Sequence, residues 1–206
     1  MIRKSMLLKK LQDSHNHEKK ITGIMGVNSG VGVTFTGILL AHFFGVEKGI
    51  PTAYLECNNH QDFNRLQDVY EWCQEDEESF AMDNITYYKN VPAGQISGIL
   101  NEDYGSYILD FGTDFDAARE EFFRCSTKII IGDRGIWNLS KIISFLKSTE
   151  DIKGSENWIY IIPCADRRTI LGMANKTSRC FYGLPYESDP TTLSKKTFDL
   201  FQSIYF

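Results

Sequence analysis

A glycine-rich segment between two apolar runs constrains the fold of this chain more than any other feature. Residues 21–27 form a short apolar run that predicts a buried strand, and residues 34–46 predict a helix that is apolar nearly all round. The segment between them, residues 26–34, reads GVNSGVGVT. In such a turn, backbone N–H groups and the helix N-terminus can face one anion. The segment therefore predicts an α/β fold with a phosphate-binding loop after its first strand.

The rest of the chain alternates between short apolar runs, typical of buried strands, and segments with the periodicity of helices. Strands are predicted at residues 52–57, 85–88, 107–111, 128–132, 158–163 and 179–184, and helices at 62–74, 115–125, 138–146, 166–175 and 192–205. This alternation favours βαβ units, hence a mostly parallel central sheet with helices on both faces. We expect one domain over residues 20–206, after a polar N-terminal lead-in at 1–19.

Composition excludes several classes of protein. The formal net charge of −5 argues against a general affinity for nucleic acid. Five cysteines without a CxxC pair fit neither a disulfide framework nor a zinc site. The N-terminus has no secretory apolar core, and no apolar stretch approaches the ~18 residues of a membrane span. We expect a cytoplasmic protein that contacts membrane only through a partner or its N-terminal segment.

The loop supplies the candidate nucleotide-binding residues. Glycines let the backbone approach phosphates, and Thr34 opens the helix with a hydroxyl group that suits Mg²⁺. A lysine usually precedes this hydroxyl residue, but the chain has Val33 there. Losing one such charge partner costs about 2–4 kcal/mol of transition-state stabilisation, so hydrolysis should be slow. The candidates are Asn28, Ser29, Gly30, Val31, Gly32, Val33, Thr34 and Phe35.

Several segments together resemble the MinD/ParA group of deviant Walker-A ATPases, which includes the pilus-localisation proteins TadZ and CpaE. Residues 21–41, ITGIMGVNSGVGVTFTGILLA, are similar to the first strand and loop of that family. Asn28 stands at the signature lysine and Val33 at the phosphate lysine. Residues 49–58 resemble the second strand, with Glu56 and Asn58 in place of its two aspartates. An asparagine cannot accept a proton from an attacking water.

The resemblance implies a SIMIBI-type P-loop NTPase fold that binds ATP or ADP with Mg²⁺. It implies that Asp110, at the end of the strand 107–111, helps Thr34 to hold the metal. It also implies that Pro185 flanks the adenine base. A protein partner and a homodimer belong to the same expectation, although the signature lysine of the dimer is absent.

Three interpretations of the function stay open at this point. The first is a scaffold or localisation factor, connected to pilus assembly by the resemblance, that binds nucleotide without efficient hydrolysis. The second is a slow ATPase in which a partner or one of Arg134, Arg167 and Arg168 replaces the lost charge. The third is an interaction module without a ligand. Val33 and Asn58 argue against the second, and Thr34 with the loop glycines argues against the third.

Two further groups of residues are open to interpretation. We expect His42 to be a core residue and His60 to lie near the ligand edge of the sheet. The C-terminal segment 198–206 is unusually apolar, and it either packs on the sheet or forms an interface.

Overall fold

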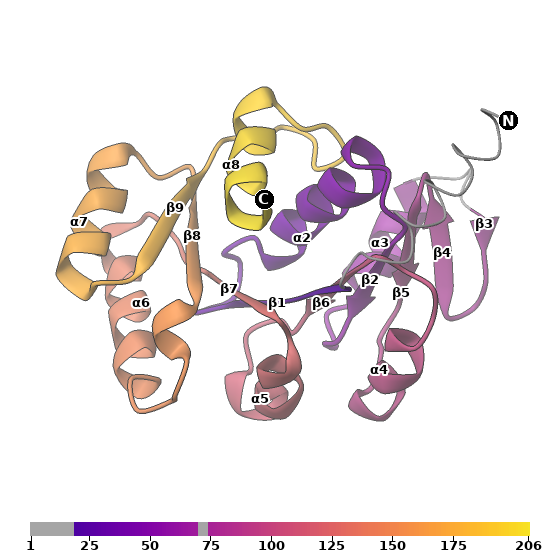
Figure 1. Ribbon diagram of the computed structural model, residues 1–206, viewed down its shortest axis with the longest axis horizontal. Coiled ribbons are helices and arrows are strands. Elements are labelled where there is room, and N and C mark those ends of the chain that lie inside the picture. Colours follow the sequence, from indigo (N-terminus) through magenta and orange to yellow (C-terminus); the bar gives the residue numbers. More distant parts are fainter. Residues whose placement is uncertain (1–18, 70–73) are drawn as a thin grey trace, which may run out of the picture.

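A computed structural model describes residues 19–69 and 74–206. This part of the chain forms one nine-stranded sheet in the order β3-β4-β5-β2-β6-β1-β7-β8-β9 (Figure 1). The strands are β1 (Lys20–Gly26), β2 (Thr52–Glu56), β3 (Gln74–Glu75), β4 (Ser79–Met82), β5 (Ile85–Tyr88), β6 (Ser106–Asp110), β7 (Thr127–Ile131), β8 (Ile159–Pro163) and β9 (Cys180–Leu184). Along this order, every pair of neighbours from β5 to β9 is parallel. The two pairs at the other edge, β3–β4 and β4–β5, are antiparallel.

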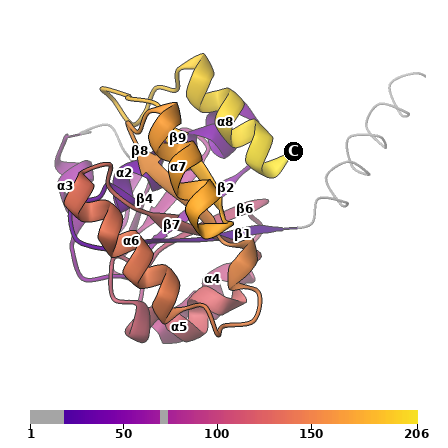
Figure 2. The ribbon, with the colours of Figure 1, turned by 90° about the vertical axis from the view of Figure 1, so that its left-hand side faces the viewer.

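The helices form a layer on each face of the sheet, as the alternation predicts. They are α2 (Val33–His42), α3 (Asp62–Val69), α4 (Ala93–Leu100), α5 (Phe115–Arg124), α6 (Ile136–Ser148), α7 (Arg167–Thr177) and α8 (Lys195–Tyr205), with a π-helical turn at Phe43–Glu47 and a 3₁₀ turn at Ser155–Asn157. Side chains of α2, α3 and α8 belong to one buried apolar cluster, and those of α4, α5, α6 and α7 belong to the other. Figure 2 shows α8 on one side of the strands and α4 and α5 on the opposite side. The predicted α/β fold class is confirmed.

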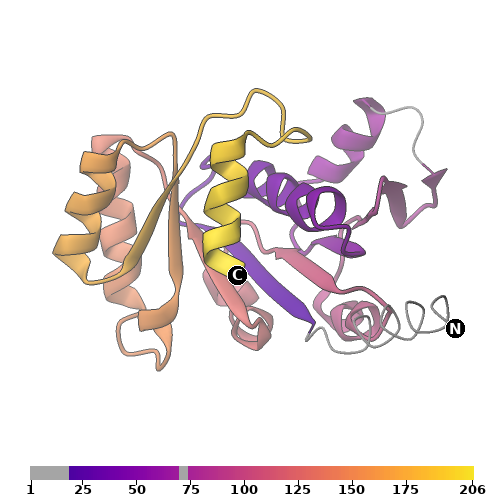
Figure 3. The ribbon, with the colours of Figure 1, turned by 45° about the horizontal axis from the view of Figure 1, so that its top comes forward.

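The apolar C-terminal segment packs on the sheet. Helix α8 lies beside α2 in Figures 1 and 3, and its Phe201 is fully buried. The ring of Phe43 lies 5.6 Å from that of Phe201, and the ring of Phe44 lies 4.8 Å from that of Tyr205. Such aromatic pairs add to the burial of apolar area, so α8 fixes the end of α2.

Some element boundaries differ from the sequence-based predictions. The helix predicted at 62–74 is described only as far as Val69, and Gln74 begins a short strand. Helix α6 begins at Ile136, two residues before the predicted start, and the side chain of Asn138 within it donates to Asp133. The sequence analysis missed α4, whose two glycines disfavour a helix, and β4. The predicted N-terminal lead-in lies outside the described residues, apart from Lys19.

No described helix is long and apolar enough to cross a membrane. The four described cysteines, Cys57, Cys125, Cys164 and Cys180, are free thiols.

Candidate phosphate-binding site

The glycine-rich segment forms the predicted turn between β1 and α2. The backbone N–H of Gly26 donates to the carbonyl of Gly112, and that of Val27 donates to the carbonyl of Ile131. Gly30 and Gly32 have φ angles of 77° and 92°, a left-handed conformation that only glycine adopts without strain. Gly32 precedes α2 without a side-chain cap, so the first N–H groups of this helix have no partner of their own in the helix. The turn therefore presents backbone donors to an anion.

The side chain of Thr34 meets two carboxylates. Its Oγ1 lies 2.8 Å from Oδ2 of Asp110, at the end of β6, and 3.2 Å from Oδ2 of Asp62, at the start of α3. A hydroxyl group has one proton, so it donates to only one of these acceptors at a time. Three side-chain oxygen atoms therefore lie close together here. Oxygen atoms are the ligands that Mg²⁺ prefers. The predicted pairing of Thr34 with Asp110 is present, and Asp62 is an addition that the sequence analysis missed.

Asp110 is fully buried, and its hydrogen bonds are supplied by neighbouring elements. Its Oδ1 accepts from the backbone N–H of Gly112 at 2.9 Å, and its Oδ2 lies 3.3 Å from the hydroxyl group of Tyr54. Burial raises the pKa of Asp110, while the donors Gly112, Thr34 and Tyr54 act to lower it. A bound cation would favour the ionised form of the Asp110 carboxylate. The environment of Asp110 therefore suits a carboxylate that binds a metal.

The hydroxyl group of Tyr54 reaches Asp110 because helix α2 has a glycine where the ring passes. A Cβ atom on Gly37 would lie 1.9 Å from this hydroxyl oxygen. Burial raises the pKa of Tyr54 well above its ordinary value, and the Asp110 carboxylate adds to the effect. Tyr54 is therefore a neutral donor that joins the helix after the loop to the end of β6.

Asn58 holds the carboxylate of Asp110 from the other side. Its Nδ2 donates to Oδ1 of Asp110 at 3.0 Å and to the carbonyl of Asp110 at 3.1 Å. Its Oδ1 accepts from the backbone N–H of His60 at 3.0 Å. At this position the amide is a structural donor, and a carboxylate would face the charge of Asp110 directly.

Glu56 organises the start of α3. Its Oε1 accepts from the backbone N–H groups of Asp62 and Phe63, and its Oε2 accepts from that of Asn90. The side chain is 1% exposed, and burial raises the pKa of Glu56 while these backbone donors lower it. Glu56 therefore positions Asp62 next to Thr34.

A cavity of about 440 Å³ opens at the loop. It is lined by Ser29, Gly30, Val31, Gly32, Val33, Thr34, Phe35, His60, Asp62, Arg65, Gly112 and Thr113. It thus contains all the predicted loop residues from Ser29 to Phe35, and it confirms that His60 lies at the ligand edge. Val31 and Val33 are only 6% and 8% exposed, so their side chains mostly face the core while their backbone faces the cavity.

Other predicted residues lie outside this cavity. Asn28 precedes it, with its Nδ2 donating to the carbonyl of Ser29. Pro185 follows β9, which is three strands from β1, and its contact with a base remains a prediction. Arg134 donates to the carbonyl of Cys164, and Arg167 and Arg168 begin α7, so none of these three arginines lines the cavity at the loop.

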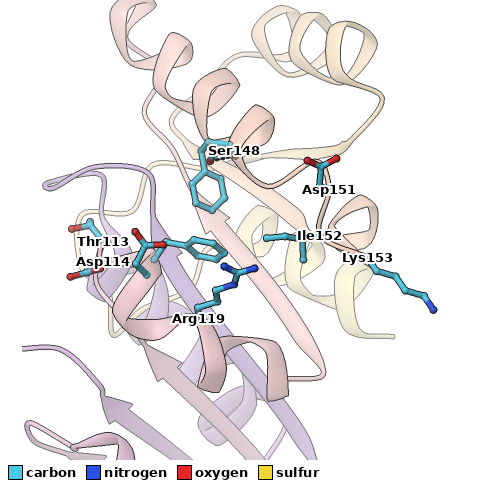
Figure 4. A pocket seen from close by; sticks show the side chains of 10 residues that line it. Thr113, Asp114, Arg119, Ser148, Asp151, Ile152 and Lys153 are labelled. Atoms are coloured by element: carbon cyan, nitrogen blue, oxygen red, sulfur yellow. Dashed lines mark hydrogen bonds between the residues drawn. The ribbon is translucent and has the colours of Figure 1, made fainter.

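A larger open groove of about 880 Å³ lies between α5 and α6 (Figure 4). Its labelled residues are Thr113, Asp114 and Arg119 in or next to α5, Ser148 at the end of α6, and Asp151, Ile152 and Lys153 in the turn after α6. Only Thr113 is shared with the cavity at the loop. Although this groove is larger than the cavity at the loop, none of its lining residues belongs to the loop. It is therefore not the candidate phosphate site.

The residues present fit a metal bound together with a nucleotide. Among the described residues, no cluster of three or more His, Cys, Asp and Glu side chains could hold a metal alone. Mg²⁺ in phosphate sites typically uses one or two carboxylates, waters and the phosphates themselves. Thr34, Asp62 and Asp110 supply the protein part of such a set.

No family model and no curated protein sequence matches this chain. Solved structures do. A plasmid partition protein of Borrelia burgdorferi bound to AMPPNP is 15% identical, with a TM-score of 0.64 over 91% of this chain and 97% of that chain. A ParA family ATPase of Chlorobium tepidum is 14% identical, with a TM-score of 0.61 over 84% and 86%.

MinD in its complex with MinC from Aquifex aeolicus is 11% identical, with a TM-score of 0.59 over 82% of each chain. At these identities the likeness concerns the fold, and it covers most of every chain compared. The chain has the fold of the ParA and MinD ATPases, a SIMIBI-type P-loop NTPase fold.

Proposed function

We propose that this protein binds a nucleoside triphosphate or diphosphate with Mg²⁺ at the loop and acts as a nucleotide-dependent scaffold or localisation factor. One observation carries the proposal: the hydroxyl group of Thr34 lies 2.8 Å from the buried carboxylate of Asp110, beside a left-handed glycine turn that opens on a cavity. This arrangement joins an anion site to a metal site. A positioning role in pilus assembly, which the resemblance implies, is the finer form of the same proposal.

In the proposed complex, the backbone donors of residues 29–34 bind the β-phosphate and its neighbours. Bound Mg²⁺ would neutralise phosphate charge next to Thr34 and Asp110. Tyr54 and Asn58 keep the Asp110 carboxylate oriented toward Thr34. Hydrogen bonds to a carboxylate favour its ionised form, which is the form that holds a metal.

Two features argue that hydrolysis is inefficient. The lysine of an ordinary phosphate loop is replaced by Val33, whose side chain is 8% exposed and belongs to the apolar core. Asn58, at the position of the family's second aspartate, has its amide committed to Asp110 and cannot accept a proton from water. Both charge stabilisation and base catalysis are weakened, so a pseudo-ATPase is the favoured form of the proposal.

The compared structures support nucleotide and partner binding as parts of the proposal. The Borrelia partition protein was solved with AMPPNP, and MinD was solved with a protein partner, MinC. In this chain, large exposed apolar side chains follow two of the parallel strands: Ile136 and Trp137 come after β7, and Tyr186 comes after β9. They therefore lie toward the same edge of the sheet as the loop, where a second copy or another protein would sense the bound nucleotide.

Isothermal titration calorimetry with Mg²⁺ and AMPPNP tests the nucleotide site. Wild-type protein should bind, and Thr34→Ala should reduce the affinity at least about tenfold in Mg²⁺ but much less in EDTA, because the hydroxyl group acts through the metal. An exposed substitution far from the loop, Gly98→Ala, is the matched control and should bind normally. If the wild-type protein binds no nucleotide, the proposal is wrong, and the third interpretation, an interaction module that has no ligand, describes the protein better. A separate assay with Mg²⁺ and ATP measures phosphate release. Release by the wild-type protein that is abolished in Thr34→Ala would show that the protein is an active ATPase.

A further inference from the structure

The cavity at the loop contains a cation that the sequence pattern does not reveal. Of the described residues that line it, Arg65 and His60 have basic side chains, and neither belongs to the loop itself. Arg65 lies in α3, one turn after Asp62. A guanidinium group has five N–H donors in a planar fork that matches phosphate oxygens, whereas an imidazole offers at most two. Arg65 is therefore the better phosphate ligand of the two.

A chain of contacts connects Arg65 to the hydroxyl group of Thr34. Its Nη1 lies 2.7 Å from Oδ1 of Asp62, and the other oxygen of Asp62 lies 3.2 Å from Oγ1 of Thr34. One carboxylate group thus separates the guanidinium from Thr34. Glu56 in turn holds the backbone of Asp62 through a 2.6 Å hydrogen bond. The guanidinium is consequently held at the cavity by the end of β2 and the start of α3.

We propose that Arg65 contacts the terminal phosphate of a bound nucleoside triphosphate and replaces the lysine that is missing at Val33. This inference rests on the proposed nucleotide site and adds to it the residue that distinguishes triphosphate from diphosphate. Asp62 is its positioning residue. The sequence analysis considered Arg134, Arg167 and Arg168 as substitutes for the missing lysine. The arginine that lines the cavity is instead Arg65, in the helix after β2.

The contact that holds Arg65 is easily exchanged. Its side chain is 74% exposed, and an exposed ion pair of this kind contributes little because water screens it. Mg²⁺ beside Thr34 would attract Asp62, since hard cations prefer carboxylate oxygens. The freed guanidinium would then meet phosphate, with which it forms strong charge-assisted hydrogen bonds. Metal and triphosphate together would therefore separate the pair, whereas a diphosphate has no γ-phosphate for Arg65 to contact.

The chain offers a matched control for this residue. Arg124 also pairs with a carboxylate three residues earlier, Glu121, at 2.6 Å, and its side chain is 66% exposed. It lies in α5 and does not line the cavity. Arg65→Gln and Arg124→Gln therefore remove the same kind of surface ion pair, and only the first changes the charge at the loop.

The experiment measures the dissociation constants of Mg²⁺-AMPPNP and Mg²⁺-ADP for wild-type protein, Arg65→Gln, Arg65→Lys and Arg124→Gln. We expect Arg65→Gln to weaken AMPPNP binding about tenfold or more, because a charge-assisted contact is lost, and to change ADP binding by less than about twofold. Arg65→Lys should restore part of the difference as a point charge. Arg124→Gln should bind both nucleotides like wild type. Circular dichroism checks that each variant is folded.

The outcomes separate this inference from the proposed function. Wild-type protein that binds neither nucleotide overturns both. Wild-type binding with equal affinities in Arg65→Gln, or an equal loss for both nucleotides, overturns the role of Arg65 and leaves the nucleotide site intact.

Discussion

The carboxylate of Glu56 accepts a hydrogen bond from the backbone nitrogen of Asp62 at 2.6 Å, and this contact joins the end of β2 to the start of α3. The same side chain accepts from the backbone N–H of Phe63 and of Asn90. Glu56 stands where the MinD/ParA family, which residues 49–58 resemble, has an aspartate. Here the side chain caps a helix, and through Asp62 it shapes the loop cavity.

Removing this cap should destabilise the protein. Glu56→Ala leaves three backbone donors without their acceptor, and we expect a loss of about 2–4 kcal/mol in the free energy of unfolding. Urea denaturation measures it, with Glu120→Ala on the exposed face of α5 as the control. A Glu56→Ala protein as stable as this control would show that the cap contributes nothing.

Restoring the family's aspartate at position 58 should harm the protein rather than activate it. Asn58→Asp exchanges a donor 3.0 Å from the Asp110 carboxylate for a second carboxylate. We expect a loss of about 1.5–3 kcal/mol at neutral pH, and a smaller loss near pH 4, where one proton is shared by the pair. Urea denaturation at the two pH values tests this. The exposed neighbour Asn59→Asp should stay within about 0.5 kcal/mol of wild type, and an equally stable Asn58→Asp would refute the assignment of Asn58 as a donor.

His42 should make the stability of the fold sensitive to mild acid. Its side chain is 3% exposed, and burial lowers the pKa of His42 below its ordinary value of 6.5, although the carboxylates of Asp83, Asp189 and Glu47 oppose this. The unfolded chain then binds more protons than the folded one, so stability is complete above pH 6.5 and declines as the pH falls through the folded-state pKa.

His42→Leu removes this titration. Its Nε2 has no hydrogen-bond partner within the described structure, so the substitution costs no hydrogen bond there. Chemical denaturation between about pH 7 and about pH 5 should give a smaller decline for His42→Leu than for wild type. Equal declines in the two proteins would show that His42 is not responsible.

Gly37 should be intolerant of alanine, whereas another helical glycine is not. A Cβ atom at Gly37 would lie 1.9 Å from the hydroxyl oxygen and 2.4 Å from Cζ of Tyr54, so Gly37→Ala must displace the Tyr54 ring. We expect a loss of about 1–3 kcal/mol and a weaker affinity for Mg²⁺-nucleotide, because Tyr54 leaves Asp110. Gly98→Ala meets no atom within 4 Å and should stabilise helix α4 by about 0.5–1 kcal/mol. Thermal denaturation distinguishes the two, and shifts in the same direction would contradict the packing argument.

Trp137 should matter for assembly and not for folding. Its side chain is 84% exposed, so Trp137→Ser should change the free energy of unfolding by less than about 0.5 kcal/mol. If a homodimer forms at the loop edge, sedimentation of wild-type protein with Mg²⁺-AMPPNP will show a dimer, and Trp137→Ser will remain monomeric. The same sedimentation for both proteins would exclude this residue from the interface.

Local sequence patterns were enough to predict the order of most elements and the place of the loop. Residues 26–34 predict the turn because glycine conformations and apolar periodicity depend on near neighbours along the chain. Thr34 was identifiable because it opens the helix directly after the glycine-rich turn. Helix α4 was missed because its glycines weaken the same local signals.

The set of side chains that meet at the loop could not be predicted from local patterns, because it depends on how the whole chain folds. Thr34 lies 28 residues from Asp62 and 76 from Asp110 along the chain. They converge because the sheet order places β6 between β1 and β2, and the carboxyl ends of these parallel strands share one edge. Strand order follows from the packing of both apolar faces together, a property of the whole chain that no local pattern contains. For that reason the sequence did not predict that Glu56 caps α3 or that Arg65 lines the cavity. It suggested Arg134, Arg167 and Arg168, which lie elsewhere.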